Sequence, residues 1–261
     1  MVHKSLTDLP RNLKEGIDWL LAVKGDDGES NLKALGAAVY DFLAQQPLAL
    51  TNVPSLENIK LISMGFMWNK ELRDLWPANV MLGKFIHSAD KKADELADTM
   101  GTRPEKVAAN IGTIVHGVEK FLDDIKHPAQ YKSAYGHKAT WDRSCAKNPE
   151  DCAAIFVGIA PMLYVGLESL RDASESASGA FLSDEISTRR FRRVFKAMGY
   201  RKRRLRPNIG GPDFLKALSN VQKDVLSILD DVSGFDDPDS ALDGKSKADS
   251  ILNDFGSWPK Y

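Results

Sequence analysis

The fold is decided by one stretch of the chain, residues 149–173, which reads PEDCAAIFVGIAPMLYVGLESLRDA. Asn148 is a favoured N-cap residue, Pro149 suits the first helical position, and two acids follow where the helix dipole favours negative charge. The section from Ala153 to Leu167 is almost wholly apolar, but its 15 residues fall short of the about 20 that cross a bilayer. A helix that is apolar on every side is buried among other helices. The stretch therefore predicts a central buried helix in an all-α protein.

Hydrophobic residues recur at helical spacing along most of the remaining chain, and no strand-like alternation persists for more than a few residues. In the first helix, Leu13, Ile17 and Leu20 share one face, and Lys14 and Asp18 lie on the opposite, polar side. We expect a bundle of about eight helices around the central one. The predicted helices lie near residues 13–24, 32–47, 55–76, 78–98, 102–122, 149–173, 184–198 and 212–229.

Three segments interrupt the helical pattern. Residues 124–148 look irregular and residues 174–182 are rich in small side chains, so both are candidate points of subdivision within a helical domain of residues 1–233. Residues 234–261 are rich in Asp, Ser and Gly. We expect this last segment to be a flexible acidic tail.

The composition is that of an ordinary globular protein, with 43% hydrophobic and 27% charged residues. The N-terminal residues lack the apolar region and cleavage site of a secretory signal, and no segment reaches transmembrane length. Nucleophile elbows, phosphate-binding loops and paired zinc-binding histidines of the known motifs do not occur in the sequence. We therefore expect no catalytic, cofactor-binding or metal-binding residues, no cofactor and no small-molecule substrate.

Positive charge is concentrated in residues 183–206, which carry ten Lys or Arg against two Asp or Glu. The whole chain has a net charge of −1, so this block of net charge +8 leaves the remainder at −9. Arginine binds phosphate well, which makes the block a candidate patch for nucleic acid or anionic lipid. The alternative is a solvated helix face followed by a basic loop. The candidate patch comprises Arg189, Arg190, Arg192, Arg193, Arg201, Lys202, Arg203, Arg204 and Arg206.

The two cysteines, Cys145 and Cys152, are seven residues apart in the sequence. Within one continuous helix that spacing is too long for a disulfide, but Pro149 begins a new helix between them. A local disulfide is then sterically allowed. Two buried thiols, or a metal-binding or catalytic role, are the alternatives.

The irregular segment also contains three aromatic residues, Tyr131, Tyr135 and Trp141. Exposed aromatic side chains are the usual anchors of protein interfaces, so this segment is a candidate interaction loop. The alternative is that the three rings attach the loop to the core.

Several blocks of the sequence resemble the variant erythrocyte surface antigens of Babesia, in particular their alpha-subunit type. The first block, residues 9–21, reads LPRNLKEGIDWLL, and the family typically opens with a Pro-x-Asn-Leu-Lys-Glu-x-Ile-Asp-Trp motif. The second block, residues 131–170, contains SAY, ATWD, SCA and the longer run FVGIAPMLY at 156–164. A third, weaker block covers residues 194–200, 213–229 and 234–235.

The resemblance implies a non-enzymatic protein on the surface of the infected red cell, with roles in antigenic variation, cytoadhesion and host–parasite interaction. Its partner would be a host-cell protein or another antigen subunit. Family members typically lack an obvious signal peptide, and this chain looks like a short form without the membrane anchor. The charge pattern favours an alternative, a soluble protein whose basic patch binds nucleic acid or anionic membrane, with binding that falls steeply as salt rises.

Overall fold

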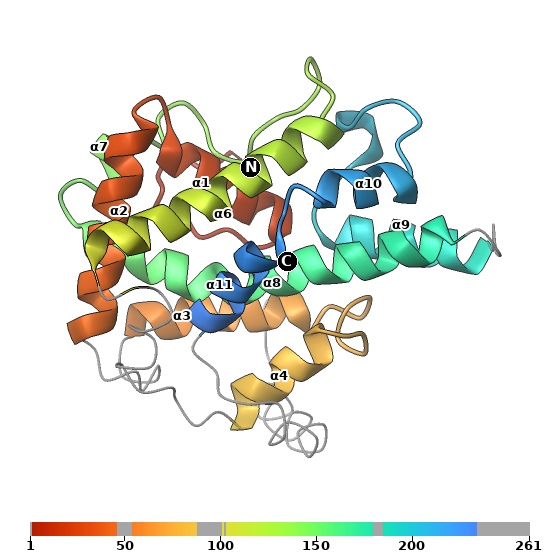
Figure 1. Ribbon diagram of the computed structural model, residues 1–261, viewed down its shortest axis with the longest axis horizontal. Helices are drawn as coiled ribbons and strands as arrows, with labels where there is room; N and C mark the ends of the chain where they lie inside the picture. Colours follow the sequence, from red (N-terminus) through yellow and green to blue (C-terminus); the bar gives the residue numbers. More distant parts are fainter. Residues whose placement is uncertain (1, 46–53, 88–100, 102, 180–184, 234–261) are drawn as a thin grey trace.

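The computed structural model describes residues 2–45, 54–87, 101, 103–179 and 185–233. The protein is all-α, as the sequence predicts (Figure 1). In this part of the chain, the elements are α1 (Leu13–Lys24), α2 (Gly28–Gln45), α3 (Pro54–Met67), α4 (Ala78–His87), α6 (Pro104–Ile125), α7 (Trp141–Ser144), α8 (Pro149–Ser178), α9 (Glu185–Ala197), the 3-10 turn η1 (Lys202–Arg204), α10 (Gly211–Leu218) and α11 (Lys223–Val232). The predicted tail, residues 234–261, lies outside the described residues.

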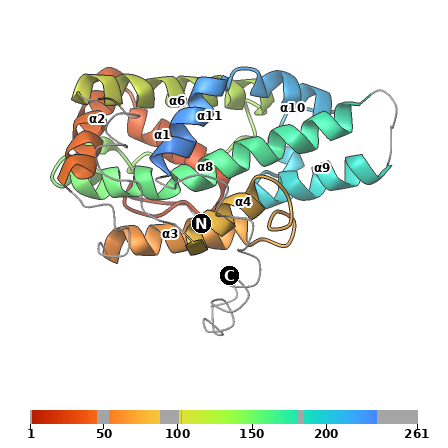
Figure 2. The same ribbon diagram turned by 60° about the horizontal axis from the view of Figure 1, so that its bottom comes forward.

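Helix α8 is the centre of the fold. Figures 1 and 2 show it running through the middle of the molecule, with α1, α2 and α6 on one side and α3 and α4 on the other. It also contacts α9, α10 and α11. Phe156 and Leu163 in its middle have no exposed surface. The predicted central buried helix is therefore confirmed.

Burial, rather than length, distinguishes α8 from a membrane span. The helix has 30 residues, and one 18-residue window within it has a mean hydropathy of 1.7. By length and composition it is able to cross a bilayer, so the predicted shortness of its apolar run is not the deciding property. Because 94% of that window is buried inside the protein, α8 is the core helix of a helical bundle.

The C-terminal end of α8 includes part of residues 174–182, which the sequence marks as a candidate point of subdivision. Helix α8 continues through Ser178, and within it the hydroxyls of Ser174 and Ser178 each donate to the carbonyl four residues earlier, at 2.6 Å. A Cβ atom on Gly211 would lie only 2.8 Å from the Cβ of Ala177, so α10 packs directly on this end of α8. The small residues therefore allow close helix packing.

The last predicted helix, residues 212–229, is divided into α10 and α11. Hydrogen bonds to neighbouring helices stabilise the turn between them. Arg171 Nη2 of α8 donates to the Val221 carbonyl at 2.8 Å, and Asn220 Nδ2 donates to Asp124 of α6 at 2.8 Å. Serine and asparagine favour such turns over helix interiors. Helix α3 likewise ends before its predicted limit, in a turn where the side chain of Asn69 accepts the Glu71 N–H at 3.0 Å.

A glycine sets the closest approach of α3 to α8. A Cβ atom on Gly158 would lie 2.4 Å from Ile59 Cγ2, and Ser63 Oγ donates to the Gly158 carbonyl at 2.7 Å. Buried hydrophobic residues from Leu6 to Val232 form one cluster, so the described helices share a single core.

Candidate functional site

The two cysteines are joined where the central helix begins. Cys145 directly follows α7, Cys152 lies in the first turn of α8, and their Cα atoms are 5.9 Å apart in a disulfide. The chain turns between the two helices, as the predicted helix start at Pro149 requires, although Asn148 makes no side-chain capping bond. Both cysteines are fully buried. In the part of the chain that the structure describes, no group of three or more His, Cys, Asp or Glu is placed to hold a metal.

The candidate interaction loop is attached to the core, which corrects the prediction built on its aromatic residues. Tyr135 and Trp141 are only 5% and 6% exposed. The Tyr135 hydroxyl donates to the Asp8 carbonyl at 2.5 Å, and that of Tyr131 donates to Asp18 Oδ1 at 2.6 Å. The three rings border an open hollow of about 800 Å³. Most of their apolar area is nevertheless buried, and the two tyrosine hydroxyls donate to groups within the protein. The structure therefore agrees with the alternative, in which the three rings attach the loop to the core.

A buried polar cluster beneath this loop is a feature that the sequence does not predict. Asp18 accepts three hydrogen bonds, from Lys14 Nζ at 2.5 Å, the Tyr131 hydroxyl at 2.6 Å and the Ala134 N–H at 2.7 Å. Lys14 Nζ also donates to the Lys132 carbonyl at 3.0 Å. Burial raises the pKa of the Tyr131 hydroxyl well above its usual value, and its neighbours add to the rise. The cluster holds the loop on α1.

The predicted arginine patch divides into cations that have partners and cations that form no side-chain ion pair with the residues that the structure describes. Arg206 donates to the Asp123 carbonyl at 2.8 Å, and Arg204 is half-buried. Three arginines of α9 form ion pairs: Arg189 with Glu185 (2.8 Å), Arg190 with Asp172 (2.5 Å) and Arg193 with Glu71 (4.0 Å). Five nearby cations are exposed and form no side-chain ion pair within the described residues: Arg192, Lys196, Arg201, Lys202 and Arg203.

The apolar side of α9 fixes the orientation of its arginines. Phe191 and Phe195 contact the ring of Phe214 in α10, with centroid distances of 5.4 and 5.5 Å. Val194 is also buried. Because this face packs on the core, the arginines project from the other faces of the helix.

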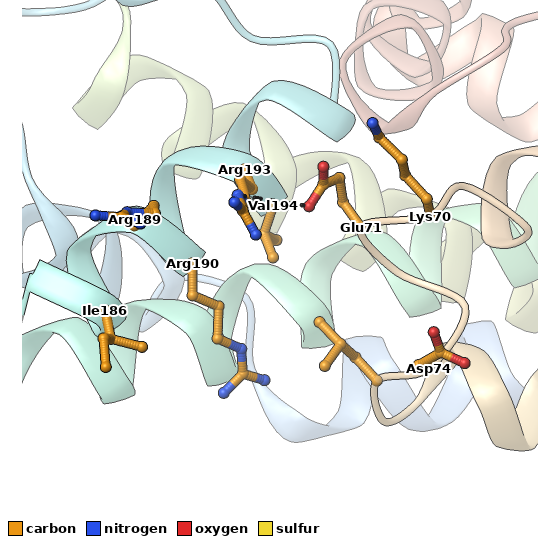
Figure 3. Close-up of a pocket in the computed structure, with 9 residues that line it drawn as sticks. Lys70, Glu71, Asp74, Ile186, Arg189, Arg190, Arg193 and Val194 are labelled. Carbon is orange, nitrogen blue, oxygen red and sulfur yellow. Dashed lines mark ion pairs between the residues drawn. The ribbon is translucent and has the colours of Figure 1, made fainter.

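A cleft lies between α9 and the turn that follows α3 (Figure 3). Its volume is about 340 Å³, and Arg193 reaches toward Glu71 across it. Four cations, two carboxylates and three apolar side chains surround the space, and of these the sequence indicates only the arginines as candidate binding residues. We call this the α9 cleft and define it by Lys70, Glu71, Asp74, Leu75, Ile186, Arg189, Arg190, Arg193 and Val194.

Comparison with known proteins gives no match to this chain among protein-family models, curated proteins or solved structures. The function must therefore be inferred from the chain's own residues: the buried disulfide, the cationic surface of α9 and the α9 cleft.

Proposed function

We propose that this chain is a non-enzymatic interaction protein of the type represented by the variant erythrocyte surface antigens of Babesia. It would act at the surface of the infected red cell, in antigenic variation and in adhesion through a protein partner. The observation that carries the proposal is the disulfide between Cys145 and Cys152. Disulfides persist in oxidising, extracellular environments and are rare in reducing ones, so the bond supports an exported protein.

The residues that carry the family resemblance also support the proposal by their position. Trp19, Tyr135, Trp141 and the two cysteines are all buried. Trp19 Nε1 donates to the Leu6 carbonyl at 2.7 Å, which attaches the N-terminal segment to α1. A core built from these residues would maintain the fold while exposed residues change, because surface substitutions usually alter the free energy of unfolding by about 0.5 kcal/mol or less. An antigen that varies its surface needs such a scaffold.

The proposal is tested by localising the native protein in infected red cells. An antibody against the folded chain should label intact cells, and a matched stain for a protein inside the parasite should label only permeabilised cells. Labelling that requires permeabilisation for both proteins would reject surface display.

The exposed cations of α9 and η1 favour a second candidate function, binding of nucleic acid or anionic membrane. Arg201, Lys202 and Arg203 are exposed together, without side-chain ion pairs in the described part of the chain. Binding through phosphate contacts weakens steeply with rising salt. Titration of the protein against a labelled oligonucleotide and anionic vesicles over a salt series tests this function. Replacement of the three cations by serine should abolish the binding and leave the fold intact.

A further inference from the structure

We infer that the α9 cleft is a docking site for a polypeptide segment of a partner protein in which acidic residues alternate with large apolar ones. The inference rests on the proposed role as an interaction protein, and it names the surface and the chemistry of the partner. Three properties of the cleft lead to it: exchangeable arginine partners, an apolar lining and carboxylates that exclude other anionic ligands.

The arginines at the cleft are available to a new acidic partner. The side chains of Arg189 and Arg193 are 59% and 60% exposed, and Arg193 meets Glu71 only at 4.0 Å. Exposed ion pairs of this kind contribute little free energy, so an incoming carboxylate can replace the present partners at small cost. Lys70 is exposed at the same cleft and adds a further positive charge.

Apolar side chains lie among these charges. Ile186 is 71% exposed at the cleft, and Leu75 is half-buried beside it. Val194 lies beneath them and is already buried in the core, so it forms the floor of the cleft. An apolar side chain of a partner would remove the exposed area of Ile186 and Leu75 from water, while its acidic neighbours paired with the arginines. Apolar anchors within a charged rim are the usual composition of a protein interface.

Nucleic acid and membranes fit this cleft less well. The carboxylates of Glu71 and Asp74 line the cleft and would repel a continuous phosphate backbone. The apolar face of α9 is not available for insertion into lipid, because Phe191 and Phe195 are packed against Phe214. A polypeptide can place single acids opposite the arginines and keep other positions neutral.

A phage-displayed library of random peptides, selected on the whole folded protein at physiological salt, tests the inference. We expect enriched peptides that combine Asp or Glu with large apolar residues. Affinity for these peptides should fall about tenfold or more in Arg189→Ser/Arg193→Ser and in Ile186→Asp. The matched control is Arg201→Ser/Arg203→Ser, which removes the same charge outside the cleft and should leave peptide affinity unchanged. Circular dichroism confirms that each variant is folded.

A charge-reversed variant gives the sharpest readout. Arg189→Glu/Arg193→Glu should select basic, apolar peptides in place of acidic ones. The inference is overturned if no acidic–apolar consensus emerges, if both serine variants lose affinity equally, or if an oligonucleotide or anionic vesicles bind this cleft more tightly than the peptides. Failure of surface labelling in infected cells would reject the proposed location without changing these results, so the two failures are distinguishable.

Discussion

Replacing Asp18 by alanine should destabilise the protein far more than replacing an exposed acid at the same helical spacing. The Lys14–Asp18 pair is i,i+4, and its side chains are 7% and 1% exposed. The Arg189–Glu185 pair has the same spacing, but its side chains are 59% and 85% exposed. The two pairs therefore differ in burial and in the further hydrogen bonds that Asp18 accepts, and the second pair is the exposed control for the first.

The expected magnitudes follow from what each substitution leaves behind. Asp18→Ala removes the acceptor of three hydrogen bonds and leaves the Lys14 ammonium buried without its carboxylate. Breaking a buried ion pair by removing one partner costs about 3–5 kcal/mol. Glu185→Ala breaks an exposed pair and should cost about 0.5 kcal/mol or less.

Urea unfolding monitored by circular dichroism measures both free-energy changes. Adding Lys14→Met to Asp18→Ala removes the unpaired ammonium, so the double mutant should be more stable than the sum of the single effects implies, with a coupling energy of about 0.5–3 kcal/mol. The reasoning is refuted if Asp18→Ala lies within about 1 kcal/mol of Glu185→Ala, or if the coupling energy is zero.

Two further predictions concern the core. Phe156→Ala should cost about 3–5 kcal/mol in urea unfolding, because Phe156 has no exposed surface, and a loss below about 0.5 kcal/mol would place α8 outside the core. Burial raises the pKa of Tyr131 and of Tyr200 above the ordinary value. Stability should therefore be fully present below the unfolded tyrosine pKa of about 10 and fall as pH rises above it. The tyrosinate absorbance of Tyr131 and Tyr200 should rise together with unfolding. Ionisation of all tyrosines in the folded protein would contradict this prediction.

The sequence predicts those parts of the fold whose signal lies within one element. The apolar run of residues 149–173 identifies α8 as buried, because a helix without a polar face needs partners on all sides. Pro149 likewise marks the break that brings Cys145 and Cys152 together. These properties depend on neighbouring residues in the chain.

The parts that the sequence mispredicts depend on contacts between distant segments. Lys14 and Asp18 read as a polar helix face, but Tyr131 and Ala134, more than a hundred residues later, cover them. The only local sign of this ion pair is the i,i+4 spacing of opposite charges. Exposed ion pairs have the same spacing, so the sequence does not show that this pair is buried. The sequence does not predict the α9 cleft for a similar reason, since the second wall of the cleft comes from the turn after α3.

The central claim, an exported helical protein closed by a disulfide, is tested most directly by the thiol state of the protein in its native cells. The cells that produce the protein are lysed in an alkylating reagent under denaturing conditions, and the chain is analysed by mass spectrometry before and after reduction. We predict no alkylated cysteine before reduction, alkylation of both Cys145 and Cys152 afterwards, and a cross-linked peptide joining them. Two alkylated cysteines before reduction would contradict the claim, because they would place the protein in a reducing compartment.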